Sequence, residues 1–275
     1  MTSVRIAILQ AQSGIDPKAN AARLVEAVEQ ASGGGAAMLF TPEMSGMLDR
    51  NRERALGKAR AEEDDAVLAA VRAAAARTGT WVHLGSLAVL GEGGKLANRG
   101  FVIDAAGDIR ARYDKIHLFD VDLPTGESWR ESAMYSAGSK AVVVAGTPVG
   151  TLGLTICYDL RFPALFERLG EAGADVIAVP AAFTVPTGQA HWSVLLRARA
   201  IEAAAFVVAA AQAGRHEDER ETYGHSLVAD PWGEVIVELD DAPGLAFAEI
   251  DLERIGEVRA RIPVLEHRRA IGRID

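Results

Sequence analysis

The sequence contains a single cysteine, Cys157, among 275 residues. One cysteine can form neither an intramolecular disulfide nor a zinc site of paired cysteines, which excludes a secreted cystine scaffold. The longest apolar run, residues 203–211, is nine residues long, whereas crossing a bilayer takes ~20. Basic residues are outnumbered, 29 Lys and Arg against 38 Asp and Glu, for a net charge of −9. This surplus of acid argues against nucleic acid or an anionic membrane as a partner.

The composition is otherwise that of an ordinary soluble globular protein, with 49% apolar and 24% charged residues. The first ten residues carry Arg5 within a short apolar stretch and show neither the cationic leader nor the cleavage site of a signal peptide. We therefore expect a cytoplasmic protein. No proline- or serine-rich linker interrupts the chain, so we expect residues 1–275 to form one domain.

Strand and helix periodicities alternate along the chain, which predicts an α/β fold. Strands are predicted at 4–12, 36–40, 81–90, 96–104, 109–113, 151–157, 176–180, 206–211 and 245–250, with a hairpin over 226–239. Helices are predicted at 20–31, 64–77, 163–171 and 191–205. Residues 33–43 and 173–182 each run from glycine through an apolar strand to a proline. This internal echo suggests two related halves packed face to face.

Cys157 follows a buried-strand pattern and precedes residues that can begin a helix, with Pro163 acceptable in a first turn. Backbone N–H groups and the positive end of a helix favour a thiolate, so this position predicts a reactive cysteine. The alternative is a small buried hydrophobic residue, the commoner role of a lone cysteine.

Three further charged residues stand at informative positions. Glu43 directly follows the strand 36–40, where α/β folds place their sites, and a buried carboxylate there suits a general base. Lys115, flanked by apolar and aromatic residues, suits stabilisation of an oxyanion. Taken singly, each residue also fits a role without chemistry. Glu43 fits a first helical turn, and Lys115 fits a lysine that reaches solvent from a strand end. Glu131 fits a solvated charge in a polar loop.

The six histidines show no spacing typical of metal ligands, and no phosphate-binding glycine loop is present; they are His83, His117, His191, His216, His225 and His267. We therefore expect no metal and no cofactor. A dyad of Cys157 with His191 or His225 stays open.

Glu43, Lys115 and Cys157 lie in the segments FTPEM, YDKIHLFD and ICYDLRFP. These resemble the three signature segments of the nitrilase, or carbon–nitrogen hydrolase, superfamily, and the resemblance covers essentially the whole chain. It implies a four-layer α-β-β-α sandwich, a Glu-Lys-Cys triad, and a homodimer or homotetramer built by helix packing. Glu131 matches the second glutamate that this superfamily places between the lysine and the cysteine.

Other segments are similar to the Nit branch, which acts on amides of 2-oxo acids: residues 187–192 and 195–202. Residues 212–216, 223–233 and 262–269 look more like deaminated glutathione amidases than like ω-amidases. The pattern departs after Gly188, where a proline is usual and this sequence has Gln189.

The resemblance implies hydrolysis of a small non-peptide amide through a thioester. Cys157 would be the nucleophile, Glu43 the acid and base, and Lys115 with the backbone N–H of Tyr158 the oxyanion donors. Glu131 would orient Lys115 and the substrate.

The substrate is expected to be an amide that carries carboxylates. Arg161 is placed to bind a carboxylate, with a helix-surface ion pair as the alternative, and Arg215 is a further source of positive charge. Expected pocket walls are Tyr158, Phe183, Thr184 and His191. The leading expectation is deaminated glutathione, cleaved to 2-oxoglutarate and Cys-Gly. The alternatives are an ω-amidase acting on 2-oxoglutaramate, a nitrilase proper, and a non-catalytic binding module on the same fold.

Overall fold

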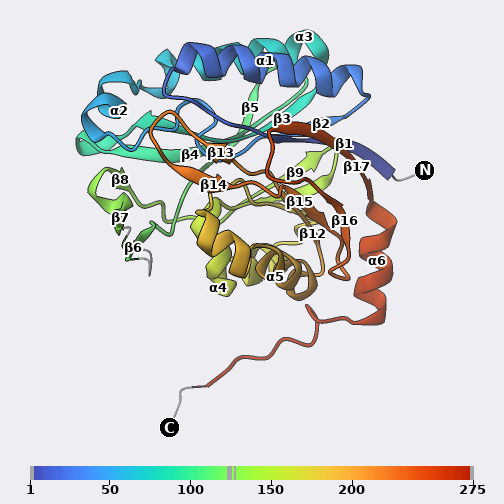
Figure 1. Ribbon diagram of the computed structural model, residues 1–275. Helices are drawn as coiled ribbons and strands as arrows, with labels where there is room; N and C mark the ends of the chain where they lie inside the picture. Colours follow the sequence, from blue (N-terminus) through green and yellow to red (C-terminus); the bar gives the residue numbers. More distant parts are fainter. Residues whose placement is uncertain (1–2, 123–125, 127, 273–275) are drawn as a thin grey trace.

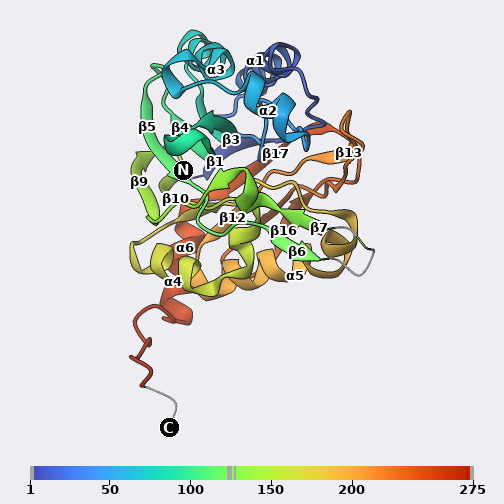
Figure 2. The ribbon, with the colours of Figure 1, turned by 90° about the vertical axis from the view of Figure 1, so that its left-hand side faces the viewer.

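The structure, a computed structural model, describes residues 3–122, 126 and 128–272. Two β-sheets pack face to face, and helices cover their outer faces (Figure 1). Figure 2 shows α1 (Pro17–Gly33) and α3 (Ala66–Thr78) outside one sheet, with α4 (Pro163–Glu171) and α5 (Val185–Ala203) outside the other. The four-layer α-β-β-α sandwich expected from the sequence is confirmed.

The first sheet has the strand order β17-β1-β2-β3-β4-β5, and β8 pairs with β4. Its strands are β1 (Ser3–Gln10), β2 (Met38–Phe40), β3 (Trp81–Leu90), β4 (Leu96–Ile103), β5 (Ile109–Asp114), β8 (Tyr135–Ser136) and β17 (Gly244–Asp251). β1, β2 and β3 run parallel, joined through α1 and α3.

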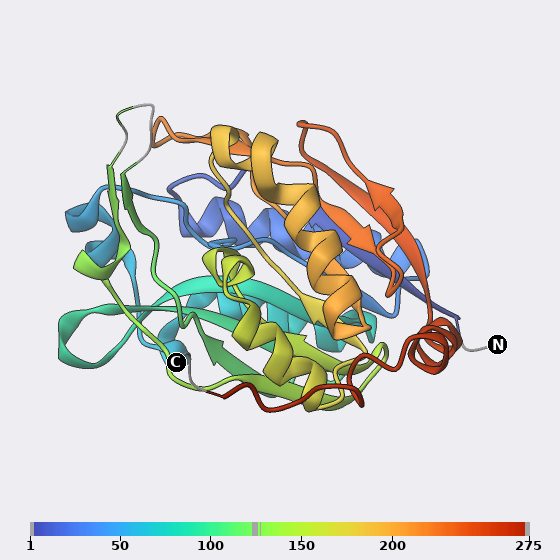
Figure 3. The same cartoon turned by 90° about the horizontal axis from the view of Figure 1, so that it is seen from below.

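The second sheet has the order β16-β15-β12-β11-β10-β9. Its strands are β9 (Val142–Thr147), β10 (Gly150–Leu154), β11 (Val176–Ala178), β12 (Phe206–Ala209), β15 (Leu227–Ala229) and β16 (Val235–Glu238). β10, β11 and β12 run parallel, joined through α4 and α5, which lie side by side in Figure 3. Each half thus repeats one βαβαβ unit, and the strands of the sequence echo, β2 and β11, occupy equivalent central places.

Several short elements were not predicted because they span too few residues to show a period. They are α2 (Arg52–Lys58), β6 (Asp120–Asp122), β7 (Ser128–Arg130), β13 (Ala213–Arg215), β14 (Glu221–Tyr223), and the 3₁₀ turns η1 (Glu62–Asp64), η2 (Glu92–Gly94), η3 (Glu131–Ala133) and η4 (Cys157–Arg161). β9 and the amphipathic α6 (Leu252–Arg261) were also missed. Helix α5 begins six residues before the predicted start at 191, because Pro186 fits its first turn.

Side-chain alternation explains the layering. Ile6 and Ile8 of β1 lie in the core between the two sheets, while Ala7 belongs to the core beneath α1 and α3. Successive residues of a strand point to opposite faces, so an apolar strand can serve both layers. Within the described part of the chain, no helix is long and apolar enough to cross a membrane.

Candidate active site

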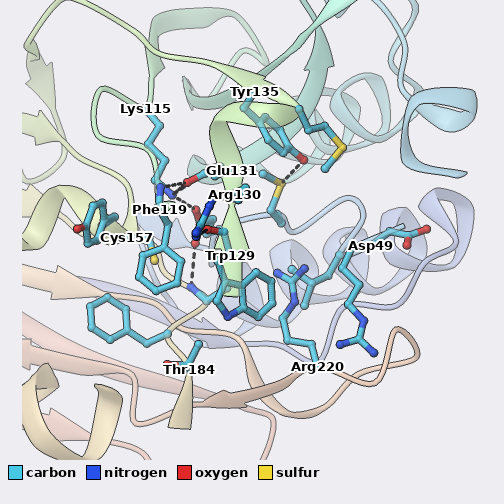
Figure 4. A pocket seen from close by; sticks show the side chains of 18 of the residues that line it. Asp49, Lys115, Phe119, Trp129, Arg130, Glu131, Tyr135, Cys157, Thr184 and Arg220 are labelled. Carbon is cyan, nitrogen blue, oxygen red and sulfur yellow. Dashed lines mark hydrogen bonds and ion pairs between the residues drawn. The ribbon is translucent and has the colours of Figure 1, made fainter. Parts of the chain in front are cut away.

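A cavity of about 450 Å³ lies where β2, β10 and β11 end, and Glu43, Lys115, Glu131 and Cys157 all line it (Figure 4). Each side chain is delivered by a different segment. Glu43 follows β2, Lys115 follows β5, Glu131 opens η3 after β7, and Cys157 opens η4 after β10. The structure therefore brings together the four residues that the sequence predicted as catalytic.

Lys115 Nζ is held between two carboxylates. It lies 3.0 Å from Glu43 Oε1 and 2.8 Å from Glu131 Oε2, and its side chain is only 2% exposed. Burial alone would lower the pKa of Lys115, but the charges of Glu131 and Glu43 outweigh burial and raise that pKa well above its usual range. The lysine therefore stays a cation inside the cavity.

Glu43 is fixed by donors on both of its carboxylate oxygens. Its Oε1 accepts from Asn98 Nδ2 at 2.8 Å as well as from Lys115, and its Oε2 accepts from the backbone N–H of Ala182 at 3.0 Å. Gln212 Nε2 donates to the Glu43 backbone carbonyl at 2.9 Å. Asn98 and Gln212 were not predicted; the only signal in the sequence is an amide side chain within or next to an apolar strand.

Glu131 is not the solvated charge that its loop suggests in isolation. Besides Lys115, its Oε2 accepts the backbone N–H of Phe119 at 2.7 Å, and its side chain is 13% exposed. The glutamate therefore ties the segment that carries Lys115 to η3.

Cys157 sits at a strained turn. Its φ is +50°, in the left-handed region that non-glycine residues seldom adopt, and its N–H donates to Pro180 O at 2.8 Å. Cys157 is the first residue of the short 3₁₀ helix η4. The first N–H groups of this helix, including that of Tyr158, therefore have no acceptor within it.

The expectation that this turn favours a thiolate is wrong for the resting protein. Burial raises the pKa of the Cys157 thiol well above its usual range, the charge of Glu43 adds to the rise, and Lys115 only partly opposes it. The desolvation cost of a buried thiolate exceeds what one short turn of backbone dipoles returns. The thiol is therefore protonated at rest, and its attack on a substrate needs a base.

The predicted walls are partly in place. Tyr158, Phe183, Thr184 and Arg161 line the cavity, and the Arg161 guanidinium lies 5.5 Å from the centre of the Phe183 ring. His191 is exposed and is not among the lining residues; its Nδ1 lies 3.2 Å from Arg161 Nη1, so it contacts the cavity only through that arginine.

One further expectation is corrected, and one alternative that the sequence left open gains no support. Arg215 is exposed and pairs with Glu219 outside the cavity, because β13 turns it to the surface. His225 stacks on Tyr223, with ring centroids 4.1 Å apart, and lies near Glu238. Neither His191 nor His225 lines the cavity with Cys157, so the structure gives no support to a Cys-His dyad.

The model of the carbon–nitrogen hydrolase family matches residues 5–260. The chain belongs to this family. A deaminated glutathione amidase of Yersinia enterocolitica is 39% identical over 275 residues, which are 99% of this chain and 95% of the relative. The matching relatives include amidases, and the chain is a carbon–nitrogen hydrolase enzyme of the amidase kind.

Solved structures of other carbon–nitrogen hydrolases share the fold. The NitFhit protein of Caenorhabditis elegans matches with a TM-score of 0.90 and 38% identity, covering 97% of this chain and 65% of the NitFhit chain. A variant of the amidase from Nesterenkonia sp. AN1 matches with a TM-score of 0.79 and 26% identity over 97% of this chain and 94% of its own. That structure shows the acetamide moiety of fluoroacetamide bound covalently at the active-site cysteine of the Nesterenkonia enzyme.

Sequence reasoning missed one group of lining residues in this carbon–nitrogen hydrolase. Arg50, Trp129, Arg130 and Arg220 also line the cavity. They come from loops and from the short β7, where no periodicity marks them.

Among the residues described, no three His, Cys, Asp or Glu side chains converge as metal ligands would.

Proposed function

We propose that Cys157, Glu43 and Lys115 form the catalytic triad of this amidase, with Glu131 holding the lysine. The observation that carries the proposal is the placement of one buried lysine between two carboxylates, in the same cavity as the only cysteine of the chain. Buried charges are costly unless they are paired, and paired groups of this kind cluster at catalytic sites.

The protonated thiol assigns the first step to Glu43. Glu43 takes the proton from Cys157 while the sulfur attacks the amide carbonyl carbon, and the carbonyl oxygen becomes an oxyanion. Lys115 Nζ and the N–H of Tyr158 hold that oxyanion. The N–H of Cys157 is already engaged with Pro180 and takes no part.

The second half returns the protons. The C–N bond breaks as Glu43 gives its proton to the departing amine, which leaves a thioester on Cys157. Glu43 then takes a proton from water, the hydroxide attacks the thioester carbonyl, and the S–C bond breaks as the proton returns to the sulfur. One water is consumed, and a carboxylic acid and an amine are released.

We further propose that the substrate is deaminated glutathione. Two observations support this: a relative that is 39% identical over nearly the full chain is a deaminated glutathione amidase, and Arg161 lines the cavity. A guanidinium there suits the carboxylate of a 2-oxo acid. Amide hydrolysis would then release 2-oxoglutarate and Cys-Gly. 2-Oxoglutaramate is the second candidate, because the same arginine suits its carboxylate.

Product analysis tests the substrate. Purified protein is incubated with deaminated glutathione and with 2-oxoglutaramate side by side, and Cys-Gly and ammonia are measured. Release of Cys-Gly with a higher kcat/KM than release of ammonia is expected. The reverse order would favour the ω-amidase, and no turnover of either would reject both substrates while leaving the triad open to its own test.

Intact-mass measurement tests the triad. Mixing the protein with substrate and quenching early should reveal an acyl adduct, which the variant Cys157→Ser should lose. An adduct on any other residue would contradict the assignment of the nucleophile.

We also propose a homodimer. Val194 and Ile201 of α5 are 69% and 51% exposed, and Trp232 near them is 48% exposed. Val194 and Ile201 share one face of α5, Trp232 comes from the turn between β15 and β16, and exposed apolar side chains gathered in this way are typical of a surface that a second copy covers. Light scattering of the purified protein should give at least twice the mass of 29.1 kDa.

A further inference from the structure

The cavity is richer in cations than the protein around it. Among the described residues, five cationic side chains and three carboxylates line it, in a chain of net charge −9. Lys115 forms ion pairs with Glu43 and Glu131. The third carboxylate, that of Asp49, is hydrogen-bonded to Arg54, which is not among the lining residues. The remaining lining cations are the arginines at 50, 130, 161 and 220, of which Arg130 is paired with Asp122 and Arg220 with Asp218.

Arg220 is held by a ring contact and an ion pair, and most of its N–H donors stay available. Its guanidinium lies 4.7 Å from the centre of the Trp129 ring, and its Nη2 lies 3.3 Å from Asp218 Oδ2. A guanidinium has five N–H donors, and this single ion pair leaves most of them available. Arg220 Nε and Trp129 Nε1 are both buried without a hydrogen-bond partner among the described residues. Within the described part of the chain, these two N–H groups therefore have no acceptor.

Asp218 brings a second arginine to the same place. Its buried carboxylate accepts the backbone N–H of Arg50 at 2.8 Å and that of Arg220 at 3.1 Å. One carboxylate shared in this way fixes both residues beside each other. The exposed guanidinium of Arg50 has no ion-pair partner within the described part of the chain.

The two arginines lie away from the nucleophile. In Figure 4, Trp129 lies between Cys157 and Arg220. Arg161, in contrast, belongs to the same η4 turn as Cys157. Positive charge is therefore present both on the turn that carries the sulfur and beyond Trp129, and an amide that reaches both places would need an acidic group for each.

We propose that Arg220, with Arg50 beside it, binds a carboxylate on the amine side of the scissile bond. The proposal rests on the proposed function, in which Arg161 takes the carboxylate of the acyl part. The substrates are then amides of amino acids or short peptides with a free C-terminal carboxylate, rather than primary amides. The planar guanidinium binds the carboxylate through paired N–H donors, and its contact with the Trp129 ring keeps it oriented.

A pair of substrates tests the subsite without any mutation. Deaminated glutathione is compared with the same compound whose glycine carboxylate is a carboxamide. Losing one charge-assisted contact should lower kcat/KM about 10- to 100-fold, mainly through KM. Equal kcat/KM for the two compounds would overturn the subsite and leave the proposed function standing.

Variants identify the residue. Arg220→Gln should lower kcat/KM for deaminated glutathione by a similar factor. The variant should then hydrolyse deaminated glutathione and its carboxamide analogue at similar kcat/KM, because the substitution and the change of substrate remove the same contact. Arg215→Gln is the matched control, since it removes an exposed arginine from the same hairpin outside the cavity. Its kinetics should equal those of the wild type. An equal loss of Arg220→Gln on both substrates would show a merely structural role and overturn the proposal.

Binding separates failure of the subsite from failure of the proposed function. If the wild type hydrolyses neither compound, both are titrated calorimetrically into the Cys157→Ser protein. Tighter binding of deaminated glutathione than of its carboxamide analogue would support the subsite, provided that adding Arg220→Gln abolishes the difference. The subsite would then stand although the proposed substrate had failed. Equal binding of the two compounds, or binding of neither, would overturn it.

Discussion

Tyr113 Oη donates a 2.7 Å hydrogen bond to the carboxylate of Asp159, which is completely buried. The same carboxylate accepts the backbone N–H of His117 at 3.1 Å and that of Ile156 at 2.9 Å. Tyr113 and His117 lie two residues on either side of Lys115, and Ile156 directly precedes Cys157. One carboxylate therefore joins the segment that carries the lysine to the turn that carries the cysteine.

Asp159 should act as a positioning residue. Asp159→Asn loses the charge that holds these donors, and a displacement of about 1 Å between lysine and sulfur typically costs about 10²-fold in rate. We expect kcat to fall by about that factor with little change in KM, measured by steady-state hydrolysis.

The matched control for Asp159 is Asp230→Asn. Asp230 is also buried and accepts the backbone N–H groups of Trp232 and Glu234, but it is not among the residues that line the cavity. Both variants should lose stability. A similar fall of kcat in both would show that the effect of Asp159 is a general loss of structure.

Glu43→Gln should slow amide hydrolysis and at the same time lower the pKa of the Cys157 thiol. A merely structural role of Glu43 would not produce this combination. The charge of Glu43 raises the pKa of the Cys157 thiol, so removing it should lower that pKa. The loss of the proton carrier should nevertheless slow amide hydrolysis by about 10²- to 10⁴-fold. Alkylation by iodoacetamide across a pH series reports Cys157 alone, because the chain has no other cysteine. A thiol pKa that rises or stays constant in the variant would refute the coupling.

Gly85→Ala should disturb both stability and activity. A Cβ at this position would lie 2.1 Å from the carbonyl oxygen of Thr41 and 2.4 Å from that of Pro42, so the backbone just before Glu43 must shift. We expect the free energy of unfolding to fall by about 1–3 kcal/mol or more and kcat to fall with it. Gly57→Ala in α2 is the control, since its Cβ would meet nothing within 4 Å. Its urea unfolding midpoint should not fall.

His83 should make the protein less stable in acid. Burial lowers the pKa of His83 from its ordinary 6.5 to about 3, so the unfolded chain binds a proton that the folded chain excludes. As the pH falls from 6.5 towards 3, the free energy of unfolding should lose about 1.4 kcal/mol per pH unit from this group. His83→Gln, followed by chemical unfolding across this range, should show a shallower slope. An unchanged slope would assign the acid sensitivity elsewhere.

The periodicity of the sequence predicted most of the long elements, although the ten-residue α6 was missed. β3 ends at the predicted residues, and α4 matches its predicted range, because apolar spacing over nine or more residues separates a helix from a strand. The short β6, β7, β13 and β14 were missed, since three residues carry no period. These hairpins nevertheless contribute to the cavity lining: β7 supplies Ser128, Trp129 and Arg130, and the turn between β13 and β14 supplies Arg220.

The sequence by itself determined an α/β fold with polar residues at strand ends, because strand alternation is a local property of the chain. The resemblance of three motifs to a known family implied the four-layer sandwich and singled out Glu43, Lys115 and Cys157 together. Only the tertiary structure decided the rest. The protonated state of Cys157 follows from burial together with the charge of Glu43, 114 positions away in the chain. The roles of Asn98, Asp159 and Arg220 likewise depend on contacts between segments that are distant in the sequence. Desolvation and charge pairing act through space, so they are set only once the two sheets have packed against each other.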